Sequence, residues 1–366
     1  MKIVFCTNTS WYAYNFYSEL LSYLLVRGYK VTVLSPDSDY FPALRDIGVD
    51  VRQFYLSRKG INPISDLSSL WDLTRIYLNE RPDYVFNFTI KPNVWSGIAC
   101  QVLGISYSNT ISGLGSSFIS NGVVKSITAC LYKISGRKAK SIFVMNADDH
   151  STVSKIYGKR SGKVIKIPGT GLDLNFYAYK KPKMLDNKIR LVFIGRLLKD
   201  KGIFELLNAF SILDRDKYEL AIVGDLDIGN PSSISILEIE KFTRKMSNVV
   251  YHGFSDDVRR FIEDSHYVIL PSYREGLPRV LMEALAIGRP ILASSVPGCM
   301  DLVNESKAGF TFEAMSVNAI VDTVNSLQHI DALKYSELSY LARKYAENNL
   351  GLSVIYDVYS HEVHDA

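Results

Sequence analysis

The sequence contains few of the residues that build metal sites and disulfide frameworks. Four cysteines and six histidines occur among 366 residues, and no histidine precedes His150. The cysteines, at positions 6, 100, 130 and 299, form no C-x-x-C pair, and the histidines have no ligand spacing. Each cysteine lies in or beside an apolar segment. We therefore predict buried free thiols and no metal site built from cysteine or histidine.

Long apolar segments are also missing. No run of about 18 apolar residues and no Arg- or Lys-led apolar leader occurs, so neither a membrane-spanning helix nor a cleaved secretory signal is predicted. We therefore expect the protein to stay in the cytosol. The sequence has no internal repeat and no low-complexity tract, which argues against a repeat architecture.

The charge is distributed unevenly along the chain. Residues 1–175 contain 20 Lys and Arg against 12 Asp and Glu, whereas the complete chain has a net charge of +4. The first half therefore carries +8 and the remainder −4, which favours an anionic partner for the first half. The basic residues form no arm and no nucleic-acid-binding motif is present, so we predict no nucleic-acid partner. Phosphorylated small molecules and anionic lipid surfaces fit the mild excess better.

Short apolar runs alternate with helix-like segments throughout the chain. In the first half the runs are 2–6, 30–34, 84–88, 141–145 and 163–167, and in the second half they are 190–194, 219–223, 249–252, 268–270 and 291–293. This alternation predicts α/β architecture with parallel, doubly wound sheets.

The length predicts two domains, because single domains rarely exceed about 300 residues. Residues 175–188 lose the periodicity and gain lysines, which is typical of a linker. We therefore predict an N-terminal domain over 1–175, a C-terminal domain over 176–345, and a closing helix over 346–366 that could return to the first domain.

Two acids stand eight positions apart in "SYREGLPRVLMEALAIGRPILAS", residues 272–294. A buried strand is predicted just before this segment, Pro278 suits a first helical position, and Gly288 suits the residue past the helix end. Ligands of parallel sheets bind beyond the carboxyl ends of the strands, so Glu275 is predicted at the ligand edge. Glu283 is one of the few polar residues on the following helix.

A second motif, "LVFIGRLLKDKGIFELLNAF", places two cations between a strand and a helix. The strand is predicted to end at Gly195, Arg196 and Lys201 follow in the loop, and the helix begins near Gly202. A helix N-terminus presents free N–H groups and a partial positive charge, so a diphosphate can bind there with both cations closing on it. Such a site needs no metal.

Simpler explanations exist for each motif. Glu283 can pair with Arg279 one turn earlier, Glu275 can be a solvated loop acid, and the two cations can be solvated side chains near a helix start. The segment "GDLDIGN" contains Asp225 and Asp227, a D-x-D pattern such as metal-dependent transferases use. His252, on a predicted strand, is interpreted as structural.

Together, "GRLLKDKG" and "PSYREGLPRVLMEALAIGRPI" resemble the family 4 retaining glycosyltransferases of the GT-B fold. The first half is similar to the branch that contains capsular-polysaccharide, O-antigen and N-glycan N-acetylgalactosaminyltransferases. The segments that carry this second similarity are 57–63, 90–100, 111–118, 144–150 and 167–177. The resemblance implies two Rossmann-like domains facing across a cleft, with the acceptor bound by the first and the donor by the second.

The resemblance also implies an activity and a set of site residues. A hexose or N-acetylhexosamine, with GalNAc and GlcNAc as the best candidates, would move from a UDP-sugar to a polyprenyl-diphosphate-linked saccharide. The implied donor residues are Gly195, Arg196 and Lys201 on the diphosphate, Glu283 on the ribose, Glu275 near the sugar, and the N–H groups of Gly276 and Leu277. Of these, Arg196, Lys201 and Glu275 would be catalytic. The acceptor side is assigned to Asn15, Arg58, Lys91, Asn93, Ser112, Gly113 and Gly115.

Two features depart from the family pattern. The loop after the first strand, "TNTSWYAYNF", lacks a glycine-rich turn, and Ser112 stands where many relatives have histidine. The implied retaining reaction lets the acceptor hydroxyl attack from the leaving-group side, so a dedicated base is not required. No metal cofactor is expected, because fixed cations serve the diphosphate. The alternative functions are a GT-B UDP-sugar 2-epimerase and a non-catalytic nucleotide-sugar-binding protein.

Residues 117–140 predict a basic amphipathic helix. At 100° per residue, one arc of about 120° contains Lys125, Lys133, Arg137 and Lys140. The other side carries Val123, Val124, Ile127, Leu131 and Ile134. One hypothesis is that the first domain rests on the cytosolic face of the cytoplasmic membrane, where a lipid-linked acceptor would lie. The alternative is a surface helix whose apolar side packs on the sheet.

Overall fold

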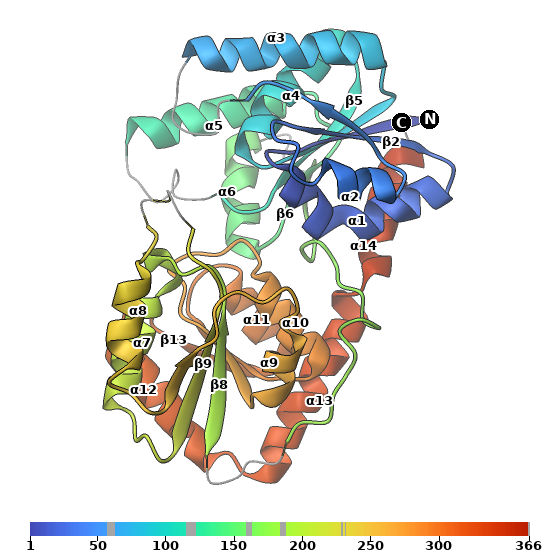
Figure 1. Ribbon diagram of the computed structural model, residues 1–366. Helices are drawn as coiled ribbons and strands as arrows, with labels where there is room; N and C mark the ends of the chain where they lie inside the picture. The colour runs from blue at the N-terminus through green and yellow to red at the C-terminus, as the bar shows by residue number, and fades with distance from the viewer. Residues whose placement is uncertain are drawn as a thin grey trace. The chain divides into compact units, whose positions relative to one another are not determined.

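A computed structural model describes residues 1–56, 63–114, 122–158, 163–183, 188–227, 230 and 232–364. The chain divides into two compact units, Met1–Gly171 with Leu352–Ala366, and Leu172–Gly351. Each unit is built around its own parallel sheet (Figure 1). The division falls after Gly171 and before Leu352, whereas the sequence placed boundaries after residues 175 and 345.

The first unit contains a seven-stranded sheet in the order β3-β2-β1-β4-β5-β6-β7. Its strands are β1 (Lys2–Cys6), β2 (Lys30–Ser35), β3 (Asp50–Gln53), β4 (Tyr84–Phe88), β5 (Ser106–Ile111), β6 (Ile142–Val144) and β7 (Val164–Lys166). Phe5 in β1 lies opposite Val33 of β2 and Phe86 of β4, and all three side chains are fully buried. Burial on both faces explains why such strands appear as continuous apolar runs. The strand order reverses between β1 and β4.

Seven helices of the first unit surround this sheet in the described ranges. They are α1 (Ser10–Val26), α2 (Phe41–Asp46), α3 (Pro63–Glu80), α4 (Ile90–Leu103), α5 (Val123–Ser135), α6 (Ala147–Tyr157) and α14 (Leu352–His364). Helix α4 packs against both α3 and α5, and α1 packs against α14 (Figure 1). The three helices α3, α4 and α5 therefore form one layer.

Helix α14 is anchored on the first unit by a buried carboxylate. Glu362 Oε2 accepts hydrogen bonds from Tyr84 Oη and Ser108 Oγ, both at 2.7 Å, and Oε1 accepts one from Ser141 Oγ at 2.6 Å. Lys140 Nζ donates to the backbone carbonyl of Glu362 at 2.9 Å. Strands β4 and β5 and the start of β6 thus all bind one side chain of the last helix.

The second unit contains a six-stranded sheet in the order β10-β9-β8-β11-β12-β13. Its strands are β8 (Ile189–Ile194), β9 (Tyr218–Val223), β10 (Val249–Tyr251), β11 (Tyr267–Leu270), β12 (Ile291–Ser294) and β13 (Gly309–Phe312). Its helices are α7 (Ile203–Ile212), α8 (Ile236–Thr243), α9 (Arg259–Asp264), α10 (Arg279–Ile287), α11 (Cys299–Ser306), α12 (Val317–Ser326) and α13 (Ala332–Asn349), with short 3-10 turns at Lys199–Lys201 and Leu327–His329. The strand order reverses between β8 and β11.

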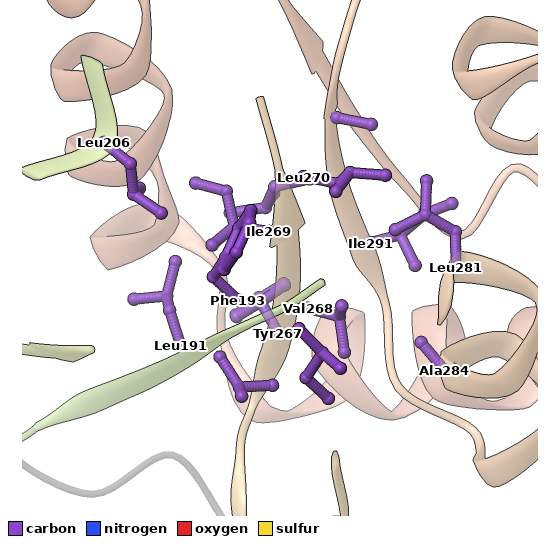
Figure 2. Packing of buried hydrophobic residues seen from close by; sticks show 14 of the residues in the cluster. Leu191, Phe193, Leu206, Tyr267, Val268, Ile269, Leu270, Leu281, Ala284 and Ile291 are labelled. Atoms are coloured by element: carbon purple, nitrogen blue, oxygen red, sulfur yellow. The ribbon is translucent and has the colours of Figure 1, made fainter. Parts of the chain in front are cut away.

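The core of the second unit lies between β8, β11 and the helices that follow them. Figure 2 shows Phe193 and Ile269 from these strands beside Leu206 of α7, and Leu281 of α10 beside Ile291 of β12. All five side chains are fully buried. Burial of each such side chain stabilises the fold by roughly 1.5–3 kcal/mol. The loops that follow β8 and β11 therefore begin at firmly packed strands.

The expectation of two parallel, doubly wound α/β sheets is confirmed. The apolar-run pattern does not predict β3, β5 and β13. Strand β5 has polar side chains, yet Ser108, Asn109 and Thr110 are buried because they bond to neighbouring elements. For example, Asn87 Nδ2 of β4 donates to Asn109 Oδ1 at 3.0 Å.

Three local expectations need correction. Pro278 is the residue before α10 rather than its first residue, whereas Gly288 ends the helix in the left-handed conformation as predicted. Cys6, Cys100 and Cys299 are buried, but Cys130 is exposed. Helix α5 ends at Ser135, so Arg137 and Lys140 lie beyond it. Within the described ranges, no helix combines the length and the apolar character that crossing a bilayer requires.

Candidate active site

The predicted donor residues gather where the strand order of the second sheet reverses. Strands β8 and β11 are neighbours, with Leu191 paired to Tyr267. Arg196 follows the end of β8, and Glu275 follows the end of β11. In doubly wound sheets, ligands bind at this reversal beyond the carboxyl ends of the strands. The topology therefore brings the two sequence motifs to one edge.

Two glycines allow the loops at this edge to contact one another through their backbones. Gly202 has φ +71°, and a Cβ atom there would lie 2.1 Å from the carbonyl oxygen of Pro271. Gly298 has φ +78°, and its Cβ would lie 2.1 Å from the carbonyl oxygen of Gly276. Any side chain at either position would push the loops apart.

Lys201 and Glu275 meet across these loops. The Lys201 Nζ atom lies 2.5 Å from Glu275 Oε1, and the two side chains are 22% and 12% exposed. Lys201 closes the 3-10 turn that precedes α7, so its backbone lies just before the N-terminus of that helix. The explanation of Glu275 as a solvated loop acid is wrong, and so is the explanation of Lys201 as a solvated cation.

Arg196 is held more loosely. Its Nη1 atom lies 2.6 Å from Asp227 Oδ2, while its side chain is 64% exposed. An exposed ion pair is worth only about 0–1 kcal/mol, so the guanidinium can leave Asp227 at little cost. The site thus contains one largely buried cation and one exposed cation, each paired with a carboxylate.

Glu283 lies on α10 and is almost completely buried. Its Oε1 atom accepts hydrogen bonds from Tyr177 Oη at 2.9 Å and from Arg279 Nε at 3.0 Å. Burial raises the pKa of Glu283, while Arg279 and Tyr177 act in the opposite direction. The pairing with Arg279 is therefore real. A carboxylate has about four lone-pair sites, so Glu283 can still accept a hydrogen bond from a ligand.

Tyr177 is a site residue that the sequence pattern does not reveal. It lies in the segment interpreted as a linker, yet it is buried against Glu283 in the second unit. The only sequence signal is aromatic: Phe176, Tyr177 and Tyr179 stand close together in a segment otherwise rich in lysine.

The D-x-D segment lies at this edge, and both of its aspartates already have hydrogen-bond partners within the protein. Asp227 Oδ2 accepts from Arg196 and also from Asn230 Nδ2 at 2.9 Å, and Asp225 Oδ1 accepts from the backbone N–H of Leu226 at 2.8 Å. No group of three or more His, Cys, Asp or Glu side chains arranged to hold a metal ion occurs in the described part of the chain. His252 follows β10 and packs on the ring of Phe261.

The predicted acceptor residues follow three adjacent strands of the first sheet. Asn15 lies on α1 after β1, Lys91 and Asn93 lie on α4 after β4, and Ser112 and Gly113 follow β5. All three strands are parallel, so these residues share the carboxyl edge of the sheet. Arg58 and Gly115, the two remaining acceptor residues, lie outside the described residues.

These side chains differ in their freedom to bind a ligand. Asn15 is exposed, and its Nδ2 atom donates to the Trp11 carbonyl at 3.0 Å. Lys91 Nζ lies 2.9 Å from Asp66 Oδ1. Asn93 is fully buried, with its amide donating to the Thr110 carbonyl at 2.8 Å and accepting from the Thr110 N–H at 3.2 Å. Asn93 therefore fixes α4 to β5, and its role toward an acceptor stays a prediction.

Thr89, between β4 and α4, is another residue that the sequence pattern does not reveal. Its φ of +70° with ψ of 174° lies in a region that costs a non-glycine residue about 1–3 kcal/mol. Its Oγ1 atom and the Oδ1 atom of Asn8 are buried and have no hydrogen-bond partner among the described residues. Such strain and unsatisfied polar atoms are typical of functional edges.

Two family models cover most of the chain. The model of the glycosyl transferases group 1 matches residues 178–345, and the glycosyl transferase 4-like model matches residues 2–146. The two matches together identify the chain as a glycosyltransferase. The sequence resemblance and the assignment as an enzyme are thereby confirmed. In this glycosyltransferase, the group 1 match contains all of the donor residues that the sequence predicts, and Tyr177 lies just before it.

Relatives and solved structures agree with this assignment. An N,N'-diacetylbacillosaminyl-diphospho-undecaprenol alpha-1,3-N-acetylgalactosaminyltransferase of Campylobacter jejuni is 26% identical, with 96% of this chain and 94% of the relative covered. The capsular polysaccharide biosynthesis glycosyltransferase CapM of Staphylococcus aureus is 25% identical over 92% and 90%. Anabaena HepE, solved in complex with UDP, has a TM-score of 0.81 at 18% identity and full coverage of both chains. The predicted GT-B fold is confirmed.

Proposed function

We propose that this glycosyltransferase moves a hexose or N-acetylhexosamine from a UDP-sugar to a polyprenyl-diphosphate-linked saccharide, with retention, during synthesis of a bacterial surface polysaccharide. The observation that carries this proposal is the meeting of Lys201 and Glu275 at the strand reversal of the second sheet, with Arg196 in the same loop as Lys201. GalNAc or GlcNAc is the proposed sugar. The name of the Campylobacter jejuni relative supports GalNAc and a diphospho-undecaprenol acceptor, and the UDP in the HepE structure supports the carrier.

The two cations serve the leaving group. As the sugar departs from UDP, negative charge develops on the β-phosphate, and fixed cations directed at that charge act mainly in the transition state. Lys201 and Arg196 would exchange Glu275 and Asp227 for the diphosphate oxygens. The N–H groups at the start of α7 and those of Gly276 and Leu277 would complete the cradle. This arrangement requires no metal ion.

The two carboxylates serve the rest of the donor. Once Lys201 turns to the diphosphate, Glu275 can accept hydrogen bonds from hydroxyls of the transferred sugar. Glu283, held in place by Arg279 and Tyr177, would accept from the ribose hydroxyls. The acceptor hydroxyl would attack from the leaving-group side, so Ser112 need not act as a base.

The lipid-linked acceptor requires the enzyme to reach a membrane surface. We therefore place this glycosyltransferase as a peripheral protein on the cytosolic face of the cytoplasmic membrane. The exposed cations Lys125 and Lys133 of α5 and Arg137 after it support this location. Lys140 does not, because its ammonium group binds the carbonyl of Glu362.

The activity is tested by following a radiolabelled sugar from UDP-GalNAc or UDP-GlcNAc in excess EDTA, with and without a lipid-linked acceptor saccharide. We expect transfer that depends on the acceptor and persists under chelation. An isomerised UDP-sugar would identify a 2-epimerase, and neither product would identify a nucleotide-sugar-binding protein. If EDTA abolishes transfer and Mn²⁺ or Mg²⁺ restores it, the enzyme depends on a metal ion. Asp225 and Asp227 would then be the candidate metal ligands.

The role of the two cations predicts the effect of removing each one. Arg196→Ala and Lys201→Ala should each lower kcat roughly 100-fold, or about 3 kcal/mol, as when one oxyanion donor is lost. Lys199→Ala is the matched control, because Lys199 lies in the same 3-10 turn and is exposed. Steady-state transfer rates measure the effect. Near-normal turnover in Arg196→Ala, or equal losses in all three variants, would remove the clamp from the mechanism.

The role of Glu283 predicts a loss of nucleotide affinity. Glu283→Ala should weaken UDP roughly 10- to 100-fold in calorimetric titration, because a hydrogen bond to a charged group contributes about 1.5–3 kcal/mol. Tyr177→Phe, which removes one partner of Glu283, should weaken UDP about 5-fold. Tyr179→Phe is its control, because Tyr179 is an exposed tyrosine of the same segment.

Unchanged UDP affinity in both Glu283→Ala and Tyr177→Phe would show that Glu283 is only the partner of Arg279. Thermal unfolding of each variant separates this outcome from a general loss of structure. Tyr177→Phe keeps the buried ring, so it still tests the role of Glu283 if Glu283→Ala does not fold.

A further inference from the structure

Six large apolar side chains are exposed on the three-helix layer of the first unit. They are Leu67 (61% exposed), Trp71 (66%) and Leu78 (57%) on α3, Val102 (72%) on α4, and Ile127 (43%) and Ile134 (50%) on α5. Figure 1 shows the three helices in one layer, and α4 packs against both of the others. Gln101 Nε2 of α4 donates to the carbonyl of Ile134 at 2.8 Å, which joins the ends of α4 and α5.

The exposed residues of α3 form a stripe. At 100° per residue, Leu67, Trp71 and Leu78 fall within an arc of about 40°. Leu73 and Tyr77, on another side of the same helix, are completely buried in the core. The stripe is therefore a second apolar face of α3, separate from the one that holds the helix on the sheet.

None of the three acids of this layer is fully exposed, and two of them are paired with cations. Helices α4 and α5 contain no Asp or Glu. In α3, Asp66 is buried against Lys91, Asp72 accepts from the backbone N–H of Tyr55 at 2.8 Å, and Glu80 is paired with Lys2 and Arg52. The exposed ionic side chains of the layer and of the turn after α5 are all cations. They are Arg75, Lys125, Lys133, Arg137 and Lys138.

We propose that α3, α4 and α5 form one docking surface, here called the three-helix face, for an anionic lipid bilayer. This inference rests on the proposed function, whose acceptor is lipid-linked. Trp71 and the aliphatic residues enter the interfacial region, where tryptophan is enriched, while the cations bind headgroup phosphates. A protein partner fits less well, because lysine is depleted at protein interfaces.

The three-helix face differs from a basic helix acting alone. Ile127 and Ile134 do not pack on the sheet, as an ordinary surface helix would require, but share the exposed surface with the cations. Binding then has two parts. The ionic part is screened by salt, whereas the apolar part, mostly from α3, persists at high salt.

The two parts are tested separately by co-sedimentation of the full chain with vesicles. Vesicles of phosphatidylcholine alone are compared with phosphatidylcholine mixed with phosphatidylglycerol, at low and high salt. Leu67→Ser with Trp71→Ser should weaken binding to the mixed vesicles roughly 10-fold or more at both salt concentrations. Changing Lys125, Lys133, Arg137 and Lys138 to Gln should remove the dependence on phosphatidylglycerol and on salt. Leu333→Ser, at an exposed leucine of the second unit, is the control and should bind as the unmodified chain does.

Cys130 offers a direct readout of contact. It is exposed on α5, whereas the other three cysteines are buried. A polarity-sensitive fluorophore attached to Cys130 of the full chain should shift to shorter wavelength with the mixed vesicles, and the shift should be lost in the Leu67→Ser, Trp71→Ser variant.

The proposal is overturned if this double variant binds vesicles like the unmodified chain, or if the substitutions instead break a dimer seen by sedimentation velocity. Transfer to a detergent-solubilised acceptor separates this failure from failure of the proposed function. The double variant should retain that activity and lose transfer only when the acceptor is embedded in vesicles. A chain that transfers to no acceptor in either setting would disprove the proposed function instead.

Discussion

The contact between the loops that follow β8 and β11 is the constraint on which the donor site depends. The strand order reverses between these two neighbours, and Gly202 brings the turn before α7 onto the carbonyl of Pro271. Lys201, at the end of that turn, therefore meets Glu275 across the loops. Both belong to motifs more than 70 residues apart, and neither motif forms a site without the other.

In the proposed function, the Lys201–Glu275 pair would let one edge hold a charged donor without a metal. An ion pair satisfies both groups, so neither side chain is buried as an isolated charge. In the proposed reaction, a diphosphate would bind the ammonium group and leave the carboxylate facing the sugar. Arg196 is paired with Asp227 in the same way, but its side chain is exposed. The two ion pairs thus keep the candidate binding groups in place.

The sequence predicts the features that depend on local pattern and on motif spacing. Apolar runs predict the strands that are buried on both faces, and a glycine after an apolar helix predicts the end of α10 at Gly288. The rule that ligands bind at strand ends predicts that Arg196, Lys201 and Glu275 lie at one edge of the sheet. Features that depend on long-range partners are not predictable in this way. Tyr177 lies in a segment without periodicity, and its partner Glu283 is 106 positions away.

Other features of the fold cannot be predicted from the sequence, for related physical reasons. Strand β5 is polar because its buried side chains bond to β4 and α14, so no apolar run marks it. Thr89 adopts a conformation that threonine normally avoids, which only the packing around it can impose. On α5, the helical period shows which residues share a side but not which side is covered, so the exposure of Ile127 and Ile134 becomes visible only in the fold.

The central claim is that Lys201 leaves Glu275 to bind the diphosphate. Calorimetric titration of UDP into the unmodified protein, Glu275→Gln, Lys201→Ala and the double variant tests it most directly. The account predicts that Glu275→Gln binds UDP at least as tightly as the unmodified protein, because Lys201 no longer has a carboxylate that competes with the diphosphate. The double variant should lose any such gain in UDP affinity, because Lys201 is then absent. UDP binding in Glu275→Gln that is weakened as much as in Lys201→Ala would show that the intact ion pair, rather than the free lysine, holds the nucleotide, and would contradict the account.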